Sequence, residues 1–265
     1  MSAALLASAA CNALDRIISV PLSPPIATIS MNAQSSGGGF VTAPIALFYR
    51  AVDNSQVIFT SVGTPDDMCH VRSVNNSGLV NIVDTLPTAA SPVSAGAFAT
   101  MQLSGHSDTL LAPGPQSVAY HAAASVPFVP GDMATFTIPG SSSGFPSATV
   151  SLMTAEAFTM DTVRFAPSGQ DVPLNWTPAS APGSVLNFTI NYVVGPTTSQ
   201  IYCQFVDDGH ASLPAALFAT FPNVNPGALI GFDAIRMRTA LVQLPGSGAV
   251  VNVISVFEFP TPRSP

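Results

Sequence analysis

The amino-acid sequence predicts an all-β protein built from two antiparallel β-sandwich domains, and three observations lead to this fold class. The 25 prolines and 19 glycines are spread along the chain and interrupt it often, with a spacing of about eight to twelve residues that is typical of short strands joined by turns. Between the interruptions, apolar and polar residues alternate with the period of two that half-buried strands show. Apolar residues make up 47% of a chain of 265 residues, which is enough to bury substantial cores.

Residues 1–30 are expected to form a separate N-terminal segment. Small residues at positions 8–10 precede Cys11, as they do at the end of a bacterial lipoprotein signal, where the cysteine is lipidated. A secretory signal also has a positively charged start, whereas the first cation here is Arg16. Two interpretations stay open: a truncated lipoprotein signal, which makes Cys11 a lipidation candidate, or a short helix or strand that packs on the body of the protein.

Residues 31–165 are expected to form the N-terminal β-sandwich. The run FVPGDMATFTIPG places a turn at Pro130–Asp132 before a strand over Met133–Ile138. The run VRSVNNSGLVNIV, residues 71–83, predicts a hairpin, because Asn and Gly supply the positive backbone angles of its turn. Residues 88–116 are rich in turn-forming residues and predict a long loop.

Residues 166–265 are expected to form the C-terminal sandwich, after a polar bridge over residues 164–171. In LNFTINYV, residues 186–193, the apolar residues alternate with Asn and Thr, which predicts a half-buried antiparallel strand. The same alternation turns Cys203 toward a core, with Trp176 as a neighbour, and turns Ile235 and Met237 inward on a third strand. About seven strands fit this length, which favours an immunoglobulin-like architecture.

The small number of charged residues excludes several classes of function. Charged residues make up 8% of the chain, the net charge is −7, and every cation other than histidine is an arginine. The absence of lysine removes Schiff-base and phosphate-loop chemistry. Nucleic acids and anionic membrane surfaces attract clustered cations, so neither is an expected partner. No run reaches the length of about 18 to 20 apolar residues that a transmembrane helix needs.

One stretch combines acids, a histidine and a cysteine: IYCQFVDDGHASLPAAL. We interpret Asp207, Asp208 and Gly209 as a tight turn, followed by a short helix capped by Ser212. The competing interpretation is a metal site formed by Asp207, Asp208 and His210, but the spacing does not fit a calcium loop. We therefore expect no metal and no other cofactor.

Two further segments contain residue types that could perform chemistry, and we interpret both as structural. In the segment TPDDMCHV, a strand would turn Cys69 and His70 to opposite faces, so Asp66, Asp67 and His70 do not make a zinc set. The segment GHSD, residues 105–108, has the residue types of a nucleophile triad without the spacing of one.

The two glutamates and the three cysteines complete the set of candidates. Glu156 and Glu258 are the only glutamates, and we place Glu156 on the solvent face of a strand rather than in a glycosidase pair. With three cysteines, Cys69 and Cys203 are the candidates for a disulfide if the protein is exported, and all three are small buried hydrophobes if it is not.

A resemblance covers roughly residues 130–257. The run PGDMATFTIPG, then FPS, PLNWTPAS, the pattern C-x-F-x-D-D-G and SLPAAL at 212–217 are similar to a group of uncharacterised exported lipoproteins of large-genome Gram-negative soil bacteria. The resemblance implies an all-β fold and an envelope or cell-surface location. It implies no catalytic residues.

The expected function is therefore non-enzymatic, in an exported surface or envelope protein that binds protein partners or assembles with itself into a filament or shell. A neutral surface favours such association, because few charges must be desolvated. One alternative is a viral jelly-roll coat protein with a projecting domain, although the sequence lacks a basic arm for a genome. The other is a secreted carbohydrate-binding module or hydrolase.

Overall fold

The structure, a computed structural model, describes residues 24–51, 67–75, 90–112, 119–194, 197–221 and 224–259, and within them it is an all-β protein. The only helix among these residues is a 3₁₀ helix, η2 (Ala215–Thr220). The strands are β1 (Pro25–Ser36), β2 (Gly39–Thr42), β3 (Ile45–Ala51), β4 (Met68–Asn75), β5 (Ala90–Pro92), β6 (Phe98–Leu103), β7 (His106–Leu111), β8 (Ala119–Ala122), β9 (Val126–Pro127), β10 (Met133–Ile138), β11 (Ala148–Met153), β12 (Val172–Asn175), β13 (Ser184–Val194), β14 (Thr197–Val206), β15 (His210–Leu213), β16 (Phe232–Gln243) and β17 (Val250–Glu258). The predicted all-β class is confirmed.

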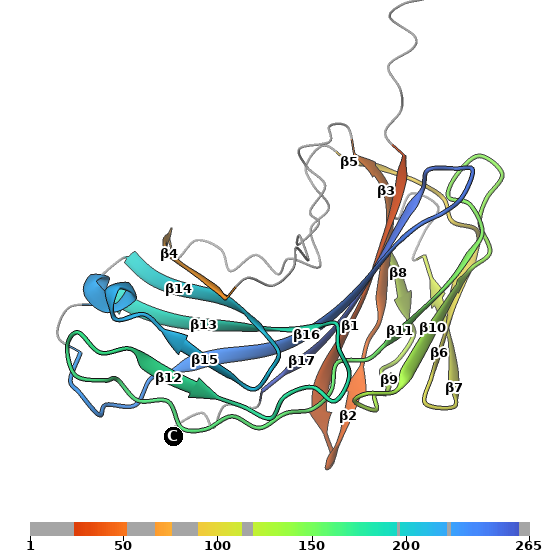
Figure 1. Ribbon diagram of the computed structural model, residues 1–265. Helices are drawn as coiled ribbons and strands as arrows, with labels where there is room; N and C mark the ends of the chain where they lie inside the picture. Colours follow the sequence, from red (N-terminus) through yellow and green to blue (C-terminus); the bar gives the residue numbers. More distant parts are fainter. Residues whose placement is uncertain are drawn as a thin grey trace, which may run out of the picture.

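One large sheet runs through the molecule. Its strand order is β11-β10-β6-β7-β8-β3-β1-β17-β16-β13-β14-β4, with β2, β5 and β9 attached beside this path. Among the described strands, all pairs are antiparallel except β1 with β17, which is parallel from Ile26 and Val250 onward. The sheet is therefore mixed, whereas the sequence predicts purely antiparallel sheets. Figure 1 shows β16 and β17 running from one half of the molecule into the other.

The sheet is covered on one side in each half, which gives the sandwich-like packing that the sequence predicts. In the N-terminal half the sheet curls, so that β11 contacts β16 and β17. Its core is built around Phe48, which packs edge to face against Tyr120 and Phe145. In the C-terminal half a two-stranded sheet of β12 and β15 forms the second layer, where Trp176 stacks on Phe205 of β14.

Hydrogen bonding crosses the expected domain limits at residues 30 and 165. Residues 25–30 belong to β1, within the segment predicted to be separate, and β1 pairs with β17 near the end of the chain. Strand β4 of the predicted N-terminal domain pairs with β14 of the predicted C-terminal domain. Residues 31–165 and 166–265 thus share one sheet, and their division into two domains stays a prediction.

Several predicted elements are observed with the expected faces. In β13, Leu186, Phe188 and Ile190 are buried, while Asn191 is exposed. The strand Met133–Ile138 follows a turn in which Gly131 has φ +80°. The predicted hairpin over 71–83 lies largely outside the described residues, which include β4 up to Asn75.

Residues 88–116 correct a prediction, because much of this segment is strand and not loop. Strands β6 and β7 form a hairpin whose two turn residues, Ser104 and Gly105, have φ values of 52° and 76°. Two consecutive positive φ angles are typical of the type I′ turn that favours tight hairpins.

No helix in the described ranges is long and apolar enough to cross a lipid bilayer.

Candidate functional site

Strand β16 brings two arginines onto a covered face of the sheet. Side chains alternate along a strand, so Ala234, Arg236 and Arg238 share one face, and all three are buried. Arg236 has no exposed surface, and Arg238 is 6% exposed. Met237, which the alternation predicts to face inward, is buried, but the face of the two arginines is covered as well.

Arg236 forms a buried ion pair with Asp207, which follows β14. Its Nε lies 2.7 Å from Asp207 Oδ2, and its Nη2 donates to Oδ1 at 2.9 Å. The Nε contact is off the line of the N–H bond, so it is a charge contact and only the Nη2 contact is a hydrogen bond. The Asp207 side chain is 2% exposed and accepts two more hydrogen bonds, from Trp176 Nε1 at 2.8 Å and Ser184 Oγ at 2.6 Å.

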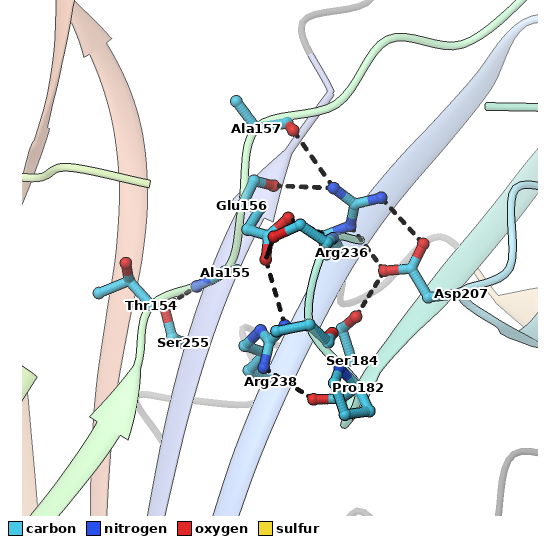
Figure 2. Close-up of polar contacts among 12 residues, drawn as sticks. Thr154, Ala155, Glu156, Ala157, Pro182, Ser184, Asp207, Arg236, Arg238 and Ser255 are labelled. Atoms are coloured by element: carbon cyan, nitrogen blue, oxygen red, sulfur yellow. Dashed lines mark hydrogen bonds and ion pairs between the residues drawn. The ribbon is translucent and has the colours of Figure 1, made fainter. Parts of the chain in front are cut away.

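The remaining donors of Arg236 are directed at main-chain carbonyls. Its Nη1 donates to the carbonyl oxygens of Glu156 and Ala157, and its Nη2 also donates to that of Thr177. The guanidinium carbon lies 4.8 Å from the centre of the Phe158 ring, as in a cation–π contact. Figure 2 shows the side chain enclosed between the 155–157 segment and Asp207.

A second, less buried pair lies beside the first. Arg238 Nη2 approaches Glu156 Oε1 at 3.3 Å and also donates to the Ala181 carbonyl, while Nη1 donates to the Pro182 carbonyl. Glu156 accepts two further hydrogen bonds from the main-chain N–H and the hydroxyl of Ser180. The prediction that Glu156 lies on the solvent face of a strand is wrong, because it follows β11 in a non-strand segment and is 16% exposed.

The environment of Glu156 lowers its pKa below the ordinary value. Burial alone would raise the pKa, since it penalises the charged form. The two hydrogen bonds from Ser180, together with the charges of Arg238 and Arg236, outweigh that effect. Glu156 is therefore held as a carboxylate.

These two pairs form one network, which we call the arginine network: Arg236, Arg238, Asp207, Glu156 and the groups that bond them. It joins β16 to the segment after β11, the segment before β13, the end of β14 and the residue after β12. The segment after β11 is also fixed by the Ala155 N–H, which donates to Ser255 Oγ of β17 at 2.9 Å. With both carboxylates paired and hydrogen-bonded, the network is suited to hold segments together and not to transfer protons.

Asp207, Asp208 and His210 do not converge on a metal site. Asp207 turns inward to Arg236, whereas the Asp208 carboxylate accepts the His210 N–H at 3.2 Å and lies 3.4 Å from His210 Nδ1 on the surface. Gly209 has φ +98°, as expected for the tight turn. Ser212 lies in β15 and caps no helix, because η2 begins at Ala215 after Pro214.

The second predicted cluster is also divided. Cys69 and Cys203 are directly opposite on β4 and β14 and are joined by a disulfide. Asp67 accepts the Val206 N–H at 3.0 Å, and His70 is exposed. Asp66 and the lipidation candidate Cys11 lie outside the described residues. Among the residues that are described, no three His, Cys, Asp or Glu side chains are grouped as metal ligands would be.

The remaining candidates do not assemble a catalytic site. In the GHSD segment, the Asp108 carboxylate accepts the N–H of Thr109 at 2.8 Å, and alternation on β7 separates Asp108 from Ser107. His106 is exposed at the hairpin end, and Glu258 is exposed at the end of β17.

Sequence reasoning missed both buried arginines, and the available signal was an i, i+2 arginine pair inside an apolar strand.

The lowered pKa of Glu156 predicts a pH-dependent stability. A carboxyl group with a lower pKa in the folded state stabilises that state at pH values above its ordinary pKa of 4.5, and the contribution is lost as the pH falls below this value. Glu156→Gln should therefore destabilise the protein near neutral pH and have a smaller effect under acid conditions. Denaturant titrations across this range test the expectation, with Glu258→Gln as the control. A pH-independent difference between Glu156→Gln and the wild type would contradict it.

Comparison with protein-family models finds no match to this chain, and comparison with curated proteins finds no significant relative.

Proposed function

We propose that this is a non-enzymatic exported protein of the cell surface or envelope that acts by binding and self-assembly. One observation carries the proposal: the outer face of β11, β10, β6 and β7 is an uncharged surface, which we call the hydroxyl face. Two rows of polar side chains cross these four strands in register. The rows are Thr149, Thr137, Thr100 and Thr109, and Ser151, Thr135, Gln102 and Ser107.

Two apolar pairs flank these rows, one on each side along the strand direction. Phe98 and Leu111 are directly opposite on β6 and β7 and are 44% and 51% exposed. Met133 of β10 is 51% exposed and lies opposite Met153 of β11. Large exposed apolar side chains next to neutral hydroxyl groups are typical of surfaces that bind other proteins.

The chemistry of the hydroxyl face favours association over solvation. Charged groups are depleted at the centres of protein interfaces, because burying an unpaired charge costs far more than burying a hydroxyl group that can be hydrogen-bonded. Thr135 and Ser151 already share a hydrogen bond of 2.8 Å, so burying these two hydroxyl groups breaks fewer hydrogen bonds to water. A second copy of the chain would therefore bury the two rows without burying a charge, with Asp132, which lines a hollow beside Gln102 and Thr135, at the rim of the interface.

Export is supported by the Cys69–Cys203 disulfide, since disulfides persist in oxidising compartments. A lipid anchor on Cys11 remains part of the proposal. The non-enzymatic role is supported by where the acids lie: Asp207 and Glu156 pair with arginines, and Asp208 bonds its own turn.

Self-assembly predicts that charge on the hydroxyl face blocks association. Thr137 and Thr109 are exposed, so their joint replacement by lysine should leave the fold intact and place unpaired charges in the interface. We expect particle sizing to show concentration-dependent assemblies for the wild type and monomers for this variant. Thr162→Lys with Gln243→Lys adds the same charge at exposed sites elsewhere and should assemble as the wild type does.

Two outcomes would contradict this proposal. A wild-type protein that stays monomeric at every concentration, or a face variant that assembles as well as the control, would exclude the hydroxyl face as the interface. Closed particles of uniform diameter would favour the alternative of a viral coat protein. Turnover of a glycan or ester substrate would favour the secreted hydrolase.

A further inference from the structure

A cavity of about 440 Å³ opens between the turn that precedes β12 and the η2 helix. In Figure 1 this helix lies on the opposite side of the molecule from β6, β7, β10 and β11, the strands of the hydroxyl face. The cavity has a volume in the range of small-molecule sites, which is roughly 300–1,000 Å³. It contains no residue of the arginine network. The ligand that this cavity could bind therefore has to be inferred from its own lining and not from the arginine network.

The apolar wall of the cavity is aromatic. Phe165, Phe218 and Phe221 all line it, and their rings meet edge to face, with centroids 5.5 Å apart for Phe165 and Phe218 and 6.0 Å apart for Phe218 and Phe221. Behind them Tyr192 packs on Phe221 at 4.8 Å. Rings in this arrangement touch one another, and the parts of them that line the cavity can make the same edge-to-face or stacked contacts with the ring of a ligand.

The walls are fixed by hydrogen bonds on both sides of the cavity. The Asp171 carboxylate accepts the Ala215 N–H at 2.9 Å, which joins the start of η2 to the turn before β12. Phe165 is held by two main-chain bonds, from its N–H to the Ala228 carbonyl and from the Gly227 N–H to its own carbonyl. A cavity with fixed walls loses little conformational entropy when a ligand enters.

Among the described residues that line the cavity, none has a charged side chain. Its polar side chains are those of Ser168 and Gln170, both exposed at the rim, and the remaining residues are Phe, Val, Ala, Pro and Gly. An ionised ligand would lose hydration here without gaining a counter-ion, whereas a neutral ligand would not. Hydroxyl or carbonyl groups of such a ligand would meet Ser168 and Gln170 at the opening.

We propose that this cavity binds a neutral small molecule that combines an apolar ring with a few hydrogen-bonding groups. The ring packs against the wall formed by Phe165, Phe218 and Phe221, and the polar groups face Ser168 and Gln170. This site is independent of the association proposed for the hydroxyl face, since it lies on other elements.

A neutral fluorescent probe, N-phenyl-naphthylamine, tests this site on the full chain. We expect its emission to rise on saturable binding to the wild type. Ala219 lines the cavity and is exposed at its edge, so Ala219→Phe should fill the space and weaken probe binding by about tenfold or more, since contacts with fixed walls are lost. Ala124→Phe makes the same change on an exposed loop elsewhere and should bind as the wild type does.

Charge selectivity is tested with the anionic probe anilinonaphthalene sulfonate, which should bind about tenfold more weakly than the neutral one because its charge has no partner. Ala216→Phe fills the same cavity from a second position and serves if Ala219→Phe does not fold, with circular dichroism as the check. The proposal is overturned if the neutral probe does not bind the wild type, if the filled variant binds as well as Ala124→Phe, or if the anionic probe binds equally.

Discussion

Asp207→Ala is expected to destabilise the protein by about 3–5 kcal/mol, the cost of leaving a buried charge without its partner. Arg236 has no exposed surface, so its guanidinium group cannot turn to water when the carboxylate is removed. The same substitution leaves Trp176 Nε1 and Ser184 Oγ without their acceptor. Denaturant unfolding measures the loss as a shift of the midpoint at constant slope.

The neighbouring acid provides a matched control. Asp208→Ala removes a surface carboxylate whose contacts are with His210, 3.4 Å away, and with the main chain of the same turn. Its effect should be well under that of Asp207→Ala, since exposed charge pairs contribute about 0–1 kcal/mol. Equal effects of the two substitutions would show that the buried ion pair does not exist as described.

A double variant separates the penalty of an unpaired charge from the net value of the pair. Asp207→Ala with Arg236→Met removes both charges, and such replacements often restore much of the stability that a single substitution removes. Trp176 is the only tryptophan, so its emission reports directly on the loss of the hydrogen bond to Asp207. We expect a changed emission in both variants and a recovered midpoint only in the double one.

The predictable part of the fold follows from local patterns. The alternation in residues 186–193 and the turn before Met133 are set by neighbours in sequence, and both are observed. The β6–β7 hairpin was missed because β7 carries His, Ser, Asp and Thr in its first four positions and so resembles a loop. The Ser104-Gly105 dipeptide between two short alternations was the signal that identifies it.

The arginine network depended on contacts that no local pattern contains. Period-two alternation identifies two faces of a strand without saying which one is covered, and in β16 the face of Arg236 and Arg238 is covered by segments around residues 156 and 178. Glu156 and Asp207 come from positions far from β16 in sequence. The parallel pairing of β1 with β17 is equally remote, because it joins the two ends of the described chain.

Reducing the Cys69–Cys203 disulfide should have the second large effect, a loss of about 2–5 kcal/mol, because the bond closes a loop of 134 residues and restricts the unfolded chain. Cys69→Ser should be as unstable as the reduced wild type and should not respond to a reductant. Cys11→Ser, which leaves this disulfide in place, is the control. If the reduced protein has free thiols at both positions and an unchanged unfolding midpoint, the bond contributes nothing to stability.

The same bond is expected to determine the local stability of β4. Among the described strands, β4 is the last of the sheet. Two of its apolar side chains, Met68 and Val71, are 49% and 41% exposed, so they add little buried surface to its contact with β14. The main-chain ladder and the disulfide therefore carry most of its attachment. Hydrogen exchange should show β4 losing protection on reduction while β13 and β16 keep theirs, since sheet edges open before cores do. Equal loss of protection across all three strands would instead mean that the disulfide stabilises the sheet as one cooperative unit.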